Sequence, residues 1–70
     1  MFEQDVFIGN LKSLRKQKGL SAAEFAEALG MSRSTISRWD SGERFPSIDV
    51  LWRIADFFDI SLDELVGRER

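Results

Sequence analysis

The sequence predicts a small all-α domain built from five helices. Apolar residues recur at three- and four-residue steps in five segments, and none of these segments has the strict alternation of a half-buried strand. Serines stand where four of the segments begin, and glycines follow four of them. A chain of 70 residues supplies apolar surface for one core, so residues 1–70 are expected to form one domain.

The first two helices are expected over residues 5–18 and 21–29. Gly19 suits the left-handed residue that ends a helix, and Ser21 with Glu24 fits a capping box at the start of the second helix. The inward stripe of the first helix comprises Phe7, Leu11, Leu14 and the stem of Arg15. The buried face of the second comprises Phe25, Ala26 and Leu29.

The third helix is expected over residues 32–41, capped by Ser32 and ended by Gly42. It is short and polar, since only Ile36 and Trp39 are expected to point inward. Its other side chains should therefore face outward.

The fourth and fifth helices are expected over residues 47–58 and 61–66. The residues that open them are Pro46 and Ser47 for the fourth and Ser61 with Glu64, a second capping box, for the fifth. The stripe of the fourth, the most apolar helix, comprises Leu51, Ile54, Ala55 and Phe58. That of the fifth comprises Leu62, Leu65 and Val66, ahead of Gly67 and a charged tail.

Four aromatic residues need separate treatment. Trp39 and Trp52 are expected to pack rather than to stack on bases, because each falls on or beside an apolar stripe. Phe57 and Phe58 are adjacent, so only one of them can face the core squarely. The other is either half exposed or part of a dimer surface.

Composition argues against several classes of protein. The chain has no cysteine and no histidine, which removes disulfides, the usual zinc ligands and the usual general base near neutral pH. It has no glycine-rich phosphate loop, and its carboxylates are scattered. Neither an enzyme nor a cofactor, metal ion or small-molecule ligand is therefore expected. No apolar run approaches the roughly 20 residues that span a bilayer, and the first residues lack the basic start of a signal peptide, so a cytoplasmic protein without a membrane partner is expected.

The formal charge of −2 argues superficially against nucleic acid, because neutralised phosphates supply much of the affinity of DNA-binding proteins. The charges are, however, distributed unevenly along the chain. Residues 12–44 hold seven cations and four acids, whereas residues 45–70 hold three cations and six acids. A protein polarised in this way would be oriented on DNA, although a split this small also arises by chance.

Residues 21–42 are the most informative segment, because only Gly30 and Met31 separate the second and third helices. Two short helices joined so closely must cross steeply. Ala26 is small enough for the backbones to approach, Gly30 tolerates a positive φ in the turn, and Ile36 fills the angle. These features predict a helix-turn-helix formed by the second and third helices.

Four linked segments carry a resemblance to a known family: residues 14–21 (LRKQKGLS), 26–32 (AEALGMS), 36–42 (ISRWDSG) and 60–65 (ISLDEL). Over residues 8–67 the chain resembles the phage-repressor and Cro-like group of bacterial helix-turn-helix regulators. The resemblance implies a lambda-repressor-like fold and a transcriptional regulator, most of all a repressor, that binds a double-stranded DNA operator with its third helix in the major groove. It also implies a homodimer, since one such domain contacts too few bases to select an operator unaided.

The resemblance places base contacts on the outward side of the third helix. The candidate base-reading residues are Arg33, Ser34, Ser37 and Arg38. The guanidinium groups of Arg33 and Arg38 can each donate to O6 and N7 of guanine, a contact worth about 1 to 3 kcal/mol of discrimination. A solvated surface or a contact to phosphates alone stays open for both arginines, and the two serines could read either base edges or the DNA backbone.

Phosphate contacts are expected at helix amino termini, where free amides and the helix dipole favour an anion. The candidate phosphate contacts are Ser21, Ala22, Ser32, Thr35 and Arg44. Ala22 departs from the resemblance, because the family commonly has a glutamine there that reaches a phosphate and braces the recognition helix. Lys12, Lys16 and Lys18 are expected either to add long-range attraction or to be solvated charges.

The resemblance also pairs Arg15 of the first helix with Asp40 of the third in a partly buried salt bridge. The family usually has the longer glutamate at the second position. Asp40 is therefore expected to reach its partner less well.

One alternative function uses the same fold. The acidic carboxyl-terminal half would dock a basic surface, which would make the chain a protein-interaction or antitoxin-like module. The dimer surface also stays open: it involves the fifth helix and the residues near Phe57, Leu62 and Val66, or it belongs to a separate domain.

Overall fold

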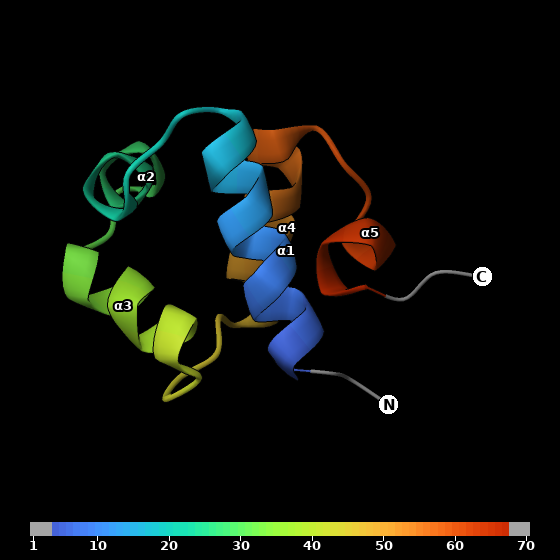
Figure 1. Cartoon of the computed structure of the whole chain (residues 1–70). Coiled ribbons are helices and arrows are strands. Elements are labelled where there is room, and N and C mark those ends of the chain that lie inside the picture. The colour runs from blue at the N-terminus through green and yellow to red at the C-terminus, as the bar shows by residue number, and fades with distance from the viewer. Residues whose placement is uncertain (1–3, 68–70) are drawn as a thin grey trace.

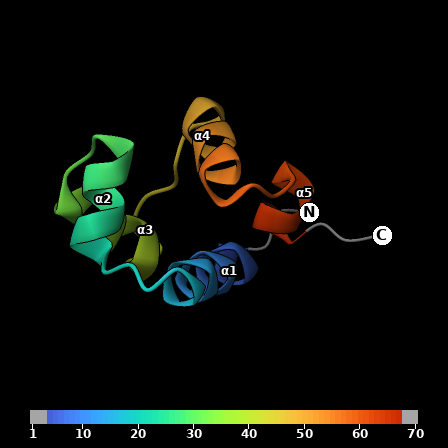
Figure 2. The same ribbon diagram turned by 90° about the horizontal axis from the view of Figure 1, so that it is seen from above.

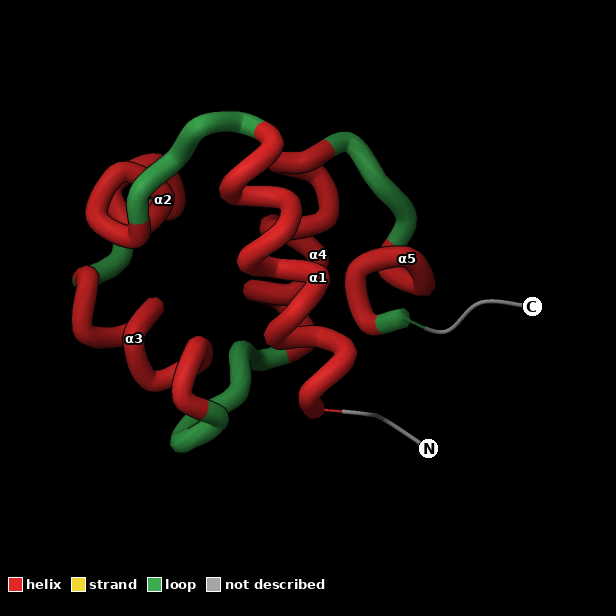
Figure 3. The backbone as a smooth tube through the Cα atoms, viewed as in Figure 1, coloured by secondary structure: helices red, strands yellow, loops and turns green. Residues whose placement is uncertain are grey.

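The computed structural model describes residues 4–67, and every regular element within this range is an α-helix (Figures 1 and 3). The helices are α1 (Gln4–Gln17), α2 (Ala22–Leu29), α3 (Arg33–Ser41), α4 (Ile48–Phe58) and α5 (Leu62–Val66). The expected all-α, five-helix fold class is thereby confirmed. Both ends of the expected domain, residues 1–3 and 68–70, lie outside the described residues.

Four of the five helices begin one residue after a serine, where the expected ranges began on the serine itself. The capping residues are Ser21, Ser32, Ser47 and Ser61. Each has extended backbone, and its hydroxyl accepts the amide three residues further on, over 3.0 to 3.4 Å. Each serine thus satisfies an amide that the helix leaves unpaired, and stands just outside the helix.

The two expected capping boxes differ. At α2 the box is complete, because the Ser21 amide donates to Glu24 Oε1 over 2.9 Å and the Glu24 amide donates to Ser21 Oγ. At α5 the Glu64 amide donates to Ser61 Oγ over 3.0 Å, but the Glu64 carboxylate accepts from the Ser61 hydroxyl instead of the Ser61 amide. The second box is therefore only half formed.

The complete box makes α2 sensitive to acid. The Ser21 amide, and then the Ser21 hydroxyl, lowers the pKa of Glu24 below its ordinary value of 4.5. A lowered pKa adds stability that is fully present above the ordinary value and is lost as the pH falls through the folded value. We expect the stability difference between the wild type and Glu24→Gln to shrink as the pH is lowered from about 5 to about 3. Urea unfolding of both proteins across this range measures it, and a difference independent of pH would contradict the assignment.

Helices α2 and α3 lie together at one end of the domain, α5 lies at the other end, and α1 and α4 run between them (Figures 1 and 2). Helix α1 contacts both α3 and α5, and α4 contacts α5. The buried core comprises Phe7, Leu11, Phe25, Ala26, Leu29, Ile36, Trp39, Ile54, Ala55, Phe58 and Leu65. Every one of these residues belongs to an expected inward stripe, so helical periodicity identified the core correctly.

The expectation that Trp52 packs in the core is wrong. Trp52 is 60% exposed, and Ile48, one turn earlier on α4, is 63% exposed. The cause is helical geometry: Trp52 lies about 200° around the helix from buried Ile54, on the opposite face. Proximity to the stripe in sequence was therefore a poor guide, whereas Trp39 is buried as expected.

Phe57 is half-buried and covers the edge of the core. Its ring centroid lies 5.8 Å from that of Phe25 and 5.0 Å from that of Phe58, the latter in an edge-to-face contact. The Lys18 ammonium lies 5.1 Å from the Phe57 centroid. The exposed side chain of Lys18 therefore lies against an aromatic surface.

The position after α5 requires glycine for two reasons, a positive φ and the absence of a side chain. Gly67 has a φ of 79°, and a side chain there would collide with Val6 of α1. Helix α4, for which the sequence suggested no stop residue, ends at Asp59 with a φ of 55°. Aspartate is one of the few residues other than glycine that adopt this left-handed backbone.

Candidate nucleic-acid interface

The turn between α2 and α3 sets the angle between the two helices. Gly30 has a φ of 69°, which glycine adopts without strain, and its amide donates to the carbonyls of Ala26 and Glu27. The Met31 amide also donates to the Ala26 carbonyl, over 2.8 Å. Because Ala26 and Ile36 are both buried, the turn holds α3 with one face against the core and the other outside.

The outer face of α3 is polar throughout. Its exposed residues include Arg33, Ser34, Ser37 and Arg38. Ile36 and Trp39, on the other side of the helix, are buried. The Ser32 hydroxyl contacts the hydroxyls of Ser34 and Thr35, over 3.1 and 2.9 Å. All four candidate base-reading residues are thus accessible on one short helix.

The two arginines of α3 differ in their surroundings. Arg38 Nε lies 3.4 Å from Glu43 Oε2, and the two side chains are 55% and 65% exposed. Arg33 takes part in no ion pair within residues 4–67. Sequence reasoning missed the Glu43 contact, because a spacing of five residues is not a helical one and the Gly42 turn brings the two residues together.

The amino termini of α2 and α3 are unequal sites for an anion. The first turn of α2 carries Glu24, whose carboxylate already accepts the Ser21 amide. The first turn of α3 carries no acid. Because an acid near a helix amino terminus opposes a second anion, α3 is the more favourable of the two ends. Ala22 is half-buried against the core, so it can offer an anion little more than its amide.

The charge division of the sequence is only partly a division in space. Arg44 is exposed just beyond α3, where its amide donates to the Arg38 carbonyl over 3.2 Å, and Lys12 and Lys16 are exposed on α1. The exposed acids of α4 and α5 are Asp49, Asp56, Asp63 and Glu64. Helices α3 and α5 stand at opposite ends of the domain (Figure 2). Helix α5 is acidic, whereas the end formed by α2 and α3 carries exposed acids, Glu24, Glu27 and Glu43, beside its arginines.

Arg15 and Asp40 connect α1 to the last turns of α3. Arg15 Nη2 donates to Asp40 Oδ2 over 2.9 Å, and the two side chains are 9% and 22% exposed. Arg15 Nη1 and Asp40 Oδ1 are buried without a hydrogen-bond partner. The short aspartate thus makes one contact where a bidentate pair would make two.

The comparison with protein families matches residues 11–65 to the family described as "Helix-turn-helix". The chain belongs to this helix-turn-helix family. It is 43% identical over 63 residues to the HTH-type transcriptional regulator AnsR of Bacillus subtilis, covering 90% of this chain and 54% of AnsR. It is 35% identical over 68 residues to the uncharacterized HTH-type transcriptional regulator YazB of the same organism, covering 97% of this chain and 99% of YazB.

A solved structure of similar sequence has the same fold. The crystal structure of a transcriptional regulator from Listeria innocua matches with a TM-score of 0.82 and 41% identity, over 91% of this chain and 60% of that chain. The helix-turn-helix chain thus spans only about half of AnsR and three fifths of the Listeria protein, whereas it spans nearly all of YazB.

Three side chains that sequence reasoning missed donate hydrogen bonds to the carboxyl ends of other helices. Gln4 Nε2 donates to the carbonyl of Gly42 over 2.7 Å, and Arg53 Nη2 donates to that of Leu29 over 2.6 Å. Asn10 Nδ2 donates to the last carbonyls of α5 over 3.2 Å. Each donor stands 24 or more residues from its acceptor, so no local pattern pointed to these bonds.

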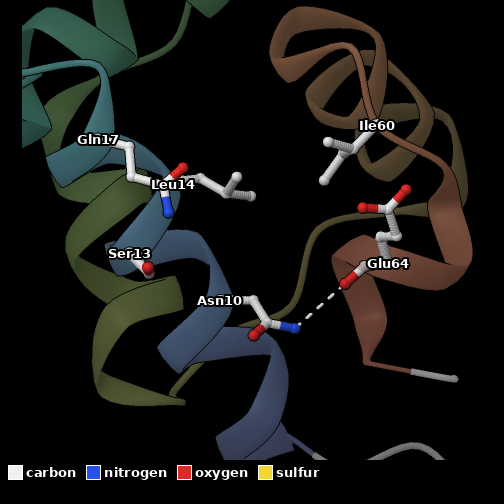
Figure 4. A pocket seen from close by; sticks show the side chains of 6 residues that line it. All are labelled: Asn10, Ser13, Leu14, Gln17, Ile60 and Glu64. Atoms are coloured by element: carbon white, nitrogen blue, oxygen red, sulfur yellow. Dashed lines mark hydrogen bonds between the residues drawn. The ribbon is translucent and has the colours of Figure 1, made fainter.

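A hollow of about 160 Å³ lies between α1 and α5 (Figure 4). Leu14 and Ile60 face each other across it, and Asn10 and Glu64 line one end, where the Asn10 amide donates to the Glu64 carbonyl. The hollow is therefore a gap between α1 and α5. The hydrogen bond from Asn10 to Glu64 closes it at one end.

The described part of the chain contains no cluster of three or more acidic, histidine or cysteine side chains that could hold a metal ion. Among residues 4–67 there is also no helix that combines the length and the hydropathy of a membrane span.

Proposed function

We propose that the chain binds double-stranded DNA sequence-specifically and regulates transcription, as a repressor that occupies its operator. The observation that carries the proposal is the outer face of α3, where the turn at Gly30 presents two arginines and two serines to solvent. A helix with this polar surface fits the major groove and can meet base edges with its donors. The transcriptional regulators among its relatives support the same function.

Each part of the proposed interface has its own role. Arg33, Ser34, Ser37 and Arg38 read bases. Ser32 and Thr35 at the start of α3, Ser21 and the Ala22 amide at the start of α2, and Arg44 beyond α3 contact phosphates. The protein acts in the cytoplasm as a homodimer on two half-sites about one helical turn apart, because a single domain contacts too few bases.

Replacing Arg33 and Arg44 separately tests the base and phosphate roles. The operator is first selected from a pool of randomised duplexes, which also yields its symmetry and half-site spacing. Arg33→Ala should then lower the preference for one base pair by about 5- to 150-fold, the equivalent of 1 to 3 kcal/mol. Arg44→Ala should weaken binding to all duplexes alike and reduce the slope of log affinity against log salt by about 1. Fluorescence anisotropy with selected and mixed duplexes over a salt series measures both effects.

Each variant is the other's matched control, since both remove one exposed arginine. Equal weakening of selected and mixed duplexes by Arg33→Ala would refute base reading by Arg33. A wild type that binds no duplex with a salt-dependent affinity would refute DNA binding as a whole, and would favour a protein-interaction or antitoxin-like module.

A further inference from the structure

Glu43 meets Arg38 on one edge of its guanidinium group. The contact joins a carboxylate oxygen of Glu43 to Nε of Arg38, over 3.4 Å. A guanidinium group has five N–H donors in a planar fork. A carboxylate at Nε therefore leaves the outer edge, formed by Nη1 and Nη2, available for a second bidentate partner such as O6 and N7 of guanine.

The backbone fixes the position of Glu43 relative to Arg38. The Glu43 amide donates to the Arg38 carbonyl over 2.9 Å, and the Arg44 amide donates to the same carbonyl over 3.2 Å. The Ser41 hydroxyl also donates to this carbonyl, and Gly42 closes the helix end with a φ of 79°. The carboxylate is therefore attached to a rigid turn, although both side chains are more than half exposed.

We infer that Glu43 is a specificity-determining residue, which positions Arg38 for one base. The inference rests on the proposed function of α3. The ion pair at Nε disfavours orientations of the Arg38 side chain that separate it from Glu43. The charge of Glu43, next to the cations that approach the backbone, repels phosphates of every sequence alike. The first effect raises the ratio of operator binding to non-specific binding, whereas the second weakens binding to all duplexes.

The test compares the wild type with Glu43→Gln, Arg38→Ala and the double variant, on the selected operator, on operators with single base-pair substitutions and on mixed duplexes. Glu43→Gln keeps the size of the side chain and removes its charge. Asp63→Asn is the matched control, because it removes one exposed acid from α5, at the end of the domain opposite α3. Thermal unfolding followed by circular dichroism verifies that each variant is folded.

We expect Glu43→Gln to bind mixed duplexes about 2- to 5-fold more tightly, and to lose about 2- to 5-fold of the preference at the base pair that Arg38→Ala identifies. In the Arg38→Ala background, Glu43→Gln should leave that preference unchanged. Asp63→Asn should change neither quantity by more than about twofold.

Three results would overturn the inference, and only the third also removes sequence-specific DNA binding by the wild type. If Glu43→Gln tightens all duplexes by one factor and leaves every base preference intact, Glu43 is merely a surface charge. If Arg38→Ala changes no base preference, Arg38 does not read a base and Glu43 has no base-reading side chain to position. In both cases sequence-specific binding by the wild type still stands, whereas a wild type that fails to distinguish operator from mixed duplexes removes both proposals.

Discussion

Replacing Arg15 by alanine is expected to lower the free energy of unfolding by about 3 to 5 kcal/mol. The substitution leaves the Asp40 carboxylate, only 22% exposed, without its partner. It also removes the apolar stem of a buried side chain whose guanidinium carbon lies 5.8 Å from the Phe25 ring centroid. Since domains of this size are marginally stable, a measurable fraction of the variant should be unfolded at 25 °C. Urea unfolding followed by circular dichroism gives the difference.

The matched control lengthens the acid instead of removing the base. Asp40→Glu adds one methylene, which lets the carboxylate approach Nη1 as well as Nη2 and satisfies atoms that are buried without partners. A gain of about 1 kcal/mol is expected. A loss below about 1 kcal/mol for Arg15→Ala would mean that the pair does not hold α1 to α3.

Phe25→Ala is the second large change, with an expected loss of about 3 to 5 kcal/mol in the free energy of unfolding. Phe25 is fully buried, and its ring contacts Phe58 at a centroid distance of 5.5 Å and Phe57 at 5.8 Å. Its removal leaves a cavity between α2 and α4, and uncovers the apolar side of Arg15. The midpoint of urea unfolding reports the loss, provided that the slope of unfolding free energy against urea concentration is the same for both proteins.

Phe45→Ala serves as the control for Phe25→Ala. Phe45 is 40% exposed, and its ring contacts Phe7 at a centroid distance of 5.6 Å. Because solvent already reaches this side chain, a loss of about 1 kcal/mol is expected. Equal losses from the two substitutions would show that Phe25 does not occupy the centre of the core.

Helix limits and the core followed from sequence because both depend on local rules. A serine caps a helix with its own hydroxyl, and residues on one helical stripe share one environment. Trp52 is the exception that shows the limit of this reasoning. Adjacency to a stripe in sequence corresponds to a rotation of about 100° on the helix, which is enough to move a large side chain into solvent.

The candidate site was predicted in part. The outward position of Arg33 and its neighbours on α3 followed from the buried positions of Ile36 and Trp39. The Glu43 contact with Arg38 did not, because it depends on the path of the chain beyond Gly42. Which bases and phosphates these side chains meet stays a prediction, since DNA geometry enters as well as protein geometry.

The bonds that fasten the ends of α2, α3 and α5 have an evolutionary consequence. Arg53, Gln4 and Asn10 each hold the carbonyl end of another helix, and none of them lies on the outer face of α3. The frame that supports the recognition helix is therefore built from different residues than the surface that would read DNA. Exposed positions of α3 can change with little loss of stability. Under the proposed function, new operator preferences would thus arise through a few surface substitutions, without compensating changes in the rest of the fold.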